Sequence, residues 1–401
     1  MFALTIGAGL FGAQSPYANL IVTMVWIVWW VGFAFVCALV GNVWALLNPL
    51  RTIFCWAEDA YTRFGRRARR SRYVCYPARL AAWPAVACFW VFAWCELIWR
   101  GKDVPFELAT IVLAYALITW LGMWAFGATR WLENGETFSL AFGVLARFAP
   151  FGVASRDGNR ALVLRPPGAG LMSGRRVSVS YMFFVLLMLA TVTFDGFQET
   201  PLMQRIDTAA QTSRVAATVL FELSEWGLDE TQLVHTAALV AFPLLFLAAF
   251  LFTCTWMVWL PDRLLSNAQR RPSITDVACT FVLTLVPIAV AYHLSHYFSL
   301  LLTAGQFIIP LASDPFGFGW NLFGTAKHRI DLGIVSPYVV WYSAVTLIVI
   351  GHVIAVYLAH VDALRLFGER RAALVSQLPM MLLMVGYTSL SLWIFAQPIV
   401  G

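Results

Sequence analysis

The sequence predicts an all-α fold, a polytopic transmembrane helical bundle with about eight spans. Hydrophobic residues occupy 60% of the 401 positions and charged residues only 12%. A soluble domain has roughly 45–50% apolar and about 25% charged residues, so this chain carries more apolar surface than a water-soluble fold can bury. Apolar runs of about 20 residues, the length that crosses a bilayer, recur along the chain. Both observations predict a membrane protein.

The spans are placed where an apolar run is bounded by charged residues. We expect a single integral membrane domain over residues 1–401, without internal repeats of 20–50 residues. The expected spans are residues 17–40, 81–99, 107–126, 181–199, 233–260, 274–302, 337–359 and 373–398.

Arginines are concentrated in every second loop, which predicts the orientation. Residues 51–80, 128–180, 261–273 and 361–372 hold 21 of the 27 Lys and Arg residues. Basic loops remain on the cytoplasmic side of a membrane. We therefore expect these loops in the cytoplasm and both termini outside, in a protein of the inner cell membrane. The net charge of +6 then reflects topology and anionic lipid, and nucleic acid is not an expected partner.

Several segments between the spans have their own expected structure. Residues 50–72 and 130–151 are amphipathic and predict two helices in the interface plane on the cytoplasmic side. The glycine- and proline-rich residues 152–174 predict a surface loop. On the outer side we expect an amphipathic helix over 209–226. Residues 303–336 form a long loop rich in aromatic and turn residues, which we interpret as a lid over the bundle.

Ionisable side chains inside a bilayer are costly, so each is a candidate site. The helical rise places Asp195, His235, His293 and His296 at a similar depth, about 5–12 Å below the outer boundary. Glu222, on the outer amphipathic helix, is expected to close over them as a further catalytic candidate.

The spacing of His293 and His296 favours a metal site. Residues at i and i+3 share one helix face, so both imidazoles can grip one ion. A divalent metal such as zinc would take these two nitrogens with His235 and Asp195, and would activate a water. Two alternatives remain open at this stage. The histidines can also bond across helices as polar glue, or line a path for a proton or a substrate.

Further candidates lie outside this cluster. Trp226, Asp314, Phe316, Phe318 and Trp320 are expected to shape a substrate pocket on the outer side. His352 lies in the inner half of its span, at a second depth. It is either a second site or a hydrogen bond between helices.

A set of segments carries a family resemblance. They are GNVWALLNPLRT (41–52), RWLENGETF (130–138), TFDGFQETP (193–201), AYHLSHYFSLLL (291–302), IIPLASDPFGFGWNLFGTA (308–326) and GHVIAVYLAH (351–360). In this order they resemble the bacterial membrane proteins known as fenitrothion hydrolases. The resemblance extends from about residue 17 to the end of the chain. It implies an integral membrane hydrolase that cleaves an organophosphorus triester and releases a nitrophenol.

Two classes of function follow. The first is a metal-assisted hydrolase whose partners are the lipid bilayer and a small apolar ester, with catalytic residues Asp195, His293, His296 and Glu222. The alternative is a membrane transporter, or a metal-handling assembly protein, with a polar intramembrane pathway. A purely structural subunit leaves several ionisable residues at one depth unexplained.

Overall fold

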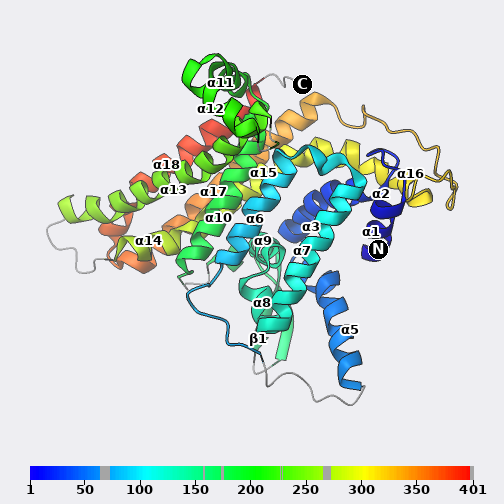
Figure 1. Ribbon diagram of the computed structural model, residues 1–401. Helices are drawn as coiled ribbons and strands as arrows, with labels where there is room; N and C mark the ends of the chain where they lie inside the picture. Colours follow the sequence, from blue (N-terminus) through cyan, green and yellow to red (C-terminus); the bar gives the residue numbers. More distant parts are fainter. Residues whose placement is uncertain are drawn as a thin grey trace. The chain divides into compact units, whose positions relative to one another are not determined.

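The chain folds into two compact units, each assembled from three stretches of sequence. The computed structural model describes residues 1–63, 73–156, 159–172, 176–225, 227, 229–264 and 272–397 (Figure 1). Unit 1 comprises Met1–Phe89, Arg100–Gly170 and Tyr297–Trp341. Unit 2 comprises Trp90–Trp99, Leu171–His296 and Tyr342–Gly401.

The chain is an all-α, multi-pass membrane protein. Within the described residues, seven helical stretches are long and apolar enough to cross a membrane. They are Leu20–Leu39, Pro105–Phe126, Val179–Gln198, Glu230–Leu264, Ile274–Ser313, Pro337–Phe367 and Arg370–Ala396. Each coincides with one of the expected spans, which confirms the fold class.

The segment expected to span at residues 81–99 differs from the others. It forms the helix Trp83–Leu97, labelled α6, with only 15 residues. At 1.5 Å per residue this is about 22 Å, less than the roughly 30 Å of a hydrocarbon core. Ala81, just before the helix, has a positive φ of 38° and turns the chain into it.

Unit 1 contains most of the N-terminal half of the chain. Its α-helices are α1 (Phe2–Phe11), α2 (Leu20–Val22), α3 (Phe33–Leu39), α4 (Trp44–Leu47), α5 (Pro49–Arg63), α7 (Pro105–Phe126), α8 (Ala128–Asn134), α9 (Thr137–Ala146) and α16 (Ile308–Ser313). A π-helical stretch, Thr23–Gly32, joins α2 to α3. The shorter 3-10 turns are Arg100–Asp103 and Ala304–Phe307, and a third, Ala169–Leu171, has residues in both units. The wide π-helical stretch carries Trp29 and Trp30, whose rings pack edge-on against Phe138 of α9.

The segment 130–151 is not the single interfacial helix expected from its pattern. It divides into α8 and α9, and nearly all of α9 is buried. The division falls at Gly135, where an added Cβ would meet the Trp131 ring at 2.6 Å. Glu136 then caps α9 by accepting hydrogen bonds from the backbone N–H groups of Phe138 and Ser139. Of the other expected interfacial helix, α5 ends at Arg63, and residues 64–72 lie outside the described residues.

The expected surface loop 152–174 contains a β-hairpin. Strand β1 (Phe151–Arg156) pairs antiparallel with β2 (Asn159–Leu164). The loop prediction was wrong because alternation over six residues is too short a signal to distinguish from a Gly-rich loop.

Unit 2 is built from long helices. They are α10 (Val179–Gln198), α11 (Pro201–Thr212), α12 (Arg214–Ser224), α13 (Glu230–Leu264), α14 (Ile274–Phe281), α15 (Val286–Thr303), α17 (Pro337–Phe367) and α18 (Arg370–Ala396). A 3-10 turn, Val282–Leu285, joins α14 to α15. Helices α6, α15 and α17 each have residues in both units. A buried apolar cluster joins α10, α11, α13 and α18; its members are Ile98, Phe194, Phe197, Met203, Leu239 and Ile394.

Helices α15 and α17 approach closely at Gly351. A Cβ at Gly351 would lie 2.4 Å from the Cβ of Ala291 and 2.8 Å from the carbonyl oxygen of Pro287. The Ser295 hydroxyl, on the same stretch of α15, donates to the carbonyl of Ala344 on α17 at 3.2 Å. The small residue therefore permits a tight contact of the kind that drives helix association in membranes.

The segment expected to form one outer amphipathic helix over 209–226 is two helices. Pro201 begins α11 early, with Thr200 as its cap. Ser213 then adopts an extended conformation, φ −71° and ψ 120°, and separates α11 from α12.

Candidate functional site

Asp195 and His296 form a hydrogen-bonded pair. Oδ2 of Asp195 on α10 lies 2.9 Å from Nε2 of His296 on α15. Gln198, one turn further along α10, donates from Nε2 to the other carboxylate oxygen at 3.1 Å. Both side chains of the pair are about four-fifths buried. A carboxylate oriented in this way fixes the imidazole tautomer.

Helix caps encoded in the local sequence fix the positions of Asp195 and His296 along their helices. Helix α10 begins at the Ser178 cap, which accepts from Tyr181 N–H, and ends just before the Thr200 cap of α11. Asp195 thus lies in the last turn of α10. The helical stretch that leads to His296 begins at a reciprocal cap between Ser273 and Asp276.

Tyr292 completes the surroundings of the pair. It lies one turn before His296 on α15, and the two rings stack with centroids 5.8 Å apart and 13° between planes. Its hydroxyl is buried and has no hydrogen-bond partner among the described residues. A Cβ on Gly196 would lie 2.3 Å from this hydroxyl oxygen, so the hydroxyl lies directly against α10 beside Asp195.

Tyr292 was not among the candidate residues predicted from the sequence. Two features of the sequence could have indicated it. Tyr292 is four residues before His296, on the same helix face, and a glycine follows Asp195. Phe395 of α18 packs against both Tyr292 and His296 and gives the pair an aromatic neighbour.

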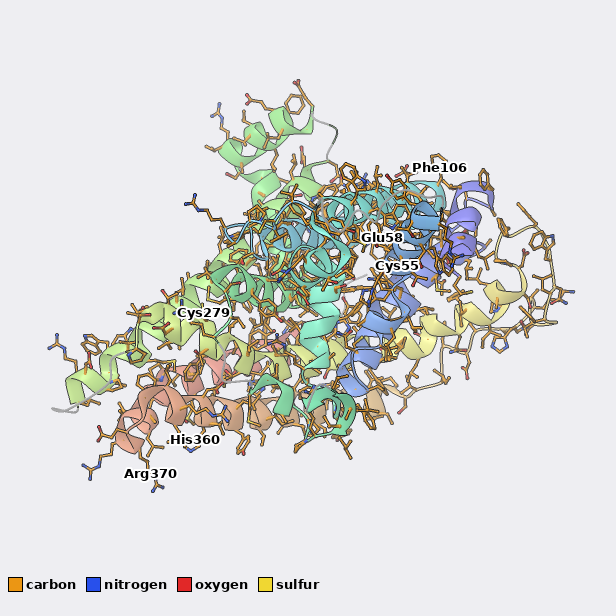
Figure 2. All side chains as sticks on the ribbon, turned by 90° about the horizontal axis from the view of Figure 1, so that it is seen from below. Cys55, Glu58, Phe106, Cys279, His360 and Arg370 are labelled. Carbon is orange, nitrogen blue, oxygen red and sulfur yellow. The ribbon has the colours of Figure 1, made fainter. Side chains whose placement is uncertain are left out.

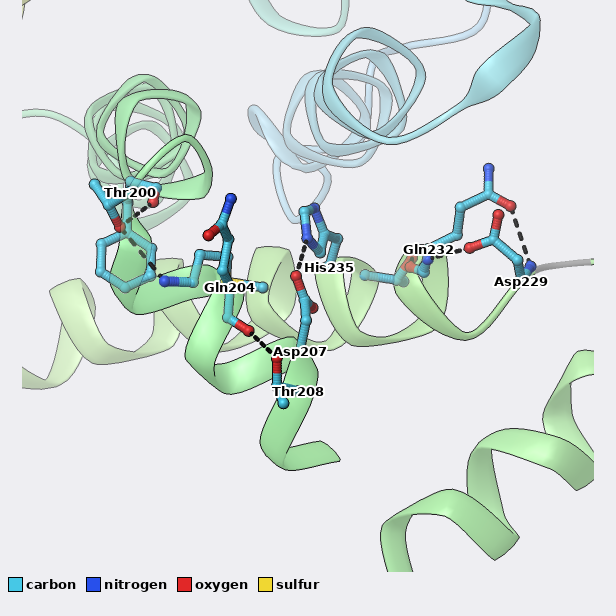
Figure 3. Close-up of polar contacts among 10 residues, drawn as sticks. Thr200, Gln204, Asp207, Thr208, Asp229, Gln232 and His235 are labelled. Atoms are coloured by element: carbon cyan, nitrogen blue, oxygen red, sulfur yellow. Dashed lines mark hydrogen bonds and ion pairs between the residues drawn. The ribbon is translucent and has the colours of Figure 1, made fainter. Parts of the chain in front are cut away.

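His293 lies on α15 one turn from His296 and is buried. His235 has a different partner. Its Nε2 lies 3.2 Å from Oδ2 of Asp207 on α11 (Figure 3). The His235 ring also meets the Phe194 ring edge-on, with centroids 6.4 Å apart. Unit 2 thus holds two separate His–Asp pairs in place of one convergent cluster.

This arrangement bears on the expected zinc centre. A catalytic zinc takes three protein ligands in addition to water. Among the described residues no three His, Cys, Asp or Glu side chains are grouped so that they could hold a metal ion. Asp195 and His296 supply two donors, while His235 is directed to Asp207. The ligand set expected from the sequence therefore does not fit a zinc centre in this arrangement.

The remaining predicted residues lie elsewhere. Glu222 is exposed on α12, and Trp226 lies outside the described residues. Asp314, Phe316, Phe318 and Trp320 belong to unit 1. There the Asp314 carboxylate accepts from the backbone N–H groups of Phe318 and Gly319, so it caps its own loop.

The three loop aromatics pack on one another with centroids 5.3–5.5 Å apart. Phe316 also packs on a cluster of Ala8, Leu20 and Leu311, and its carbonyl accepts from Ala13. The loop thus rests on α1 and on the start of the first span. Its role in a substrate pocket stays a prediction.

His352 and His360 connect α17 to α18. Nε2 of His352 lies 2.8 Å from the Met384 carbonyl oxygen and also contacts the Thr388 hydroxyl. Nδ1 of His360 lies 3.0 Å from Oε1 of Gln377. Figure 2 shows His360 on α17 and Arg370 at the first position of α18. Of the two alternatives for His352, these contacts favour the hydrogen bond between helices.

Comparison with known proteins found no matching family model, no matching curated protein and no matching solved structure.

Proposed function

We propose that the chain is an integral membrane hydrolase that cleaves a small apolar organophosphorus triester at the Asp195–His296 pair. The observation that carries the proposal is the 2.9 Å contact between the Asp195 carboxylate and His296 Nε2. Two ionisable groups inside membrane-spanning helices are expensive to retain without a function. The resemblance to fenitrothion hydrolases supports the same reaction class.

His296 acts as the general base. Because its Nε2–H donates to Asp195, the basic lone pair lies on Nδ1. Nδ1 takes a proton from water as the water oxygen attacks phosphorus and the bond from phosphorus to the aryl oxygen breaks. The imidazolium then returns its proton to the departing aryl oxide, so the products are a phosphodiester acid and a phenol. Asp195 stabilises the imidazolium in between, and general-base catalysis of this kind contributes about 10²–10⁴-fold to the rate.

Tyr292 has a second role in this proposal. Its buried hydroxyl lies against Gly196, next to the base, and lacks a hydrogen-bond partner among the described residues. A donor held in a dry site stabilises negative charge that develops on a phosphoryl oxygen. The neighbouring Phe395 ring offers an apolar surface to the aryl group.

The protein lies in the inner cell membrane with its arginine-rich loops in the cytoplasm and both termini outside. This orientation places the Asp195–His296 pair toward the outer leaflet. An apolar triester partitions into lipid and would reach the pair from the membrane.

The proposal is tested by release of nitrophenol from an aryl phosphotriester by the purified protein in detergent. His296→Ala is expected to lower kcat by about 10²–10⁴-fold. His235→Ala is the matched control, because it removes the histidine of the other His–Asp pair in the same unit. Equal activity of His296→Ala and the wild type, with His296→Ala folded, would overturn the proposal.

Two further measurements address the alternatives. Loss of turnover with a chelator, restored by zinc, would support the metal-assisted form of the reaction. Accumulation of a substrate in sealed vesicles without hydrolysis would support the transporter instead.

A further inference from the structure

The β-hairpin of unit 1 has two faces of different character. Register pairs Phe151 with Leu164 and Val153 with Leu162, so these four side chains share one face. They are exposed by 41%, 75%, 69% and 73% respectively. The next pairs along the hairpin, Ser155 with Arg160 and Arg156 with Asn159, are polar.

The base of the opposite face is held against the rest of unit 1, whereas Ala161, further along that face, is exposed. The Arg165 guanidinium donates to the carbonyls of Ala146, Arg147 and Ala149 at the end of α9. Gly152 lies over this guanidinium, where a Cβ would come within 2.8 Å of Nη1. The hairpin is therefore fixed to the end of α9 at its base, and the apolar face is left exposed.

The base of the hairpin lies at the end of a membrane span. The backbone N–H of Phe151 donates to the carbonyl of Val40 at 3.3 Å, and Val40 directly follows the span Leu20–Leu39. The apolar pairs thus lie at the base of the hairpin, beside the span end, and the polar pairs lie at its far end. From the Phe151 pair to the Arg156 pair is about 17 Å along the strands. A bilayer has the same order, because its apolar hydrocarbon core is followed by a layer of polar and charged headgroups.

The charge of the segment is strongly one-sided. Residues 147–176 contain six arginines and one acidic residue, Asp157. Two of the arginines, Arg156 and Arg160, belong to the strand pairs farthest from the base of the hairpin. Basic residues near a membrane surface are attracted to anionic headgroups by about 1 kcal/mol each.

The geometry points to a lipid-binding function for this hairpin: its apolar face inserts into the interface of the membrane that the protein crosses, and its arginine-bearing end binds anionic headgroups. The occupant is the protein's own bilayer, because the hairpin begins at a span end. The inference does not depend on the hydrolase proposal, since none of these residues belongs to the Asp195–His296 pair.

The test uses an environment-sensitive fluorophore on a single introduced cysteine in the full-length protein in nanodiscs. The accessible native cysteines Cys55, Cys75 and Cys88 are first replaced by serine. Leu162→Cys reports the apolar face, and Ala161→Cys, on the neighbouring position of the same strand, is the matched control. Quenching by nitroxide-labelled lipid and by aqueous iodide is measured with and without phosphatidylglycerol.

We expect lipid quenching at position 162 to exceed that at 161 by about twofold or more, with iodide showing the reverse order. Removing phosphatidylglycerol, or introducing Arg156→Gln with Arg160→Gln, should shift the label at 162 toward water, by about fivefold in population for each arginine. Equal iodide quenching at both positions would overturn insertion. Protection of position 162 from both quenchers would also overturn it, because a protein partner would then cover the face. Lipid quenching at position 162 that is unchanged by removal of phosphatidylglycerol and by both arginine substitutions would overturn the binding of anionic headgroups.

Discussion

The side chains of Asp195 and His296 join α10 to α15 across 101 residues of sequence, with Oδ2 2.9 Å from Nε2. The Tyr292 ring stacks on the His296 ring beside this contact. Asp195 and His296 belong to two different membrane-spanning helices. Because each group satisfies the other, removing one leaves a polar partner exposed to an apolar surrounding. The pair can therefore be tested from either side.

Asp195→Asn is expected to lower kcat for aryl phosphotriester hydrolysis by about 10²–10⁴-fold, because an amide no longer stabilises the imidazolium or fixes its tautomer. Asp207→Asn alters the equivalent carboxylate beside His235 and serves as the control. Phenol release measures both. Full turnover in the Asp195→Asn variant would show that His296 acts without its carboxylate.

Gly196→Ala is expected to destabilise unit 2. The new methyl group would lie 2.3 Å from the Tyr292 hydroxyl oxygen and 2.9 Å from a methyl carbon of Ile394. Overpacking of this kind costs about 1–3 kcal/mol, so thermal unfolding in detergent should begin at a lower temperature. Gly386→Ala in α18 is the control, since no described atom lies within 4 Å of the position that its new methyl group would occupy. An unchanged transition for Gly196→Ala would contradict the close approach of Tyr292 to α10.

Glu136→Ala is expected to destabilise unit 1. The buried carboxylate accepts from two backbone N–H groups at the start of α9 and contacts the Tyr115 hydroxyl. Loss of a helix cap costs about 0.5–2 kcal/mol, and a buried tyrosine hydroxyl left without its acceptor adds to that. Glu133→Ala, on α8, is the control and should leave unfolding unchanged, because Glu133 caps no helix. Equal unfolding temperatures for the two variants would show that Glu136 does not hold α9.

Reporter fusions at the two ends of the chain test the topology. Seven long spans with α6 as an eighth would place both termini on one side, whereas seven alone would place them on opposite sides. We expect an exported alkaline phosphatase to be active at both ends, because arginine-rich loops of membrane proteins generally remain in the cytoplasm. Activity at one end only would show that α6 does not cross.

The spans were predictable because hydrophobicity and length alone decide them, and all seven long helices lie where apolar runs lie. The hairpin and the separation of α8 from α9 were not, since they depend on local contacts such as Gly135 against Trp131. The grouping of the candidate side chains was predicted only in part, and their role in a site stays a prediction. Depth brought Asp195 and His296 to one level, and they do meet. The depth of a residue along a helix does not tell in which direction its side chain points around the helix axis. The His235 side chain points to Asp207, and this could not be predicted from depth.

Gly351 has a consequence for how the molecule can move. The Cβ of Ala291 and the carbonyl of Pro287 occupy the space that a side chain at position 351 would need. Helices α15 and α17 therefore fit together at this contact in only one position along their length. A sliding step of even one turn would bring larger residues into the same gap. Stretches of these two helices therefore travel as one rigid body during any opening motion. Any motion that opens a path to His296 must then displace elements other than these two packed stretches.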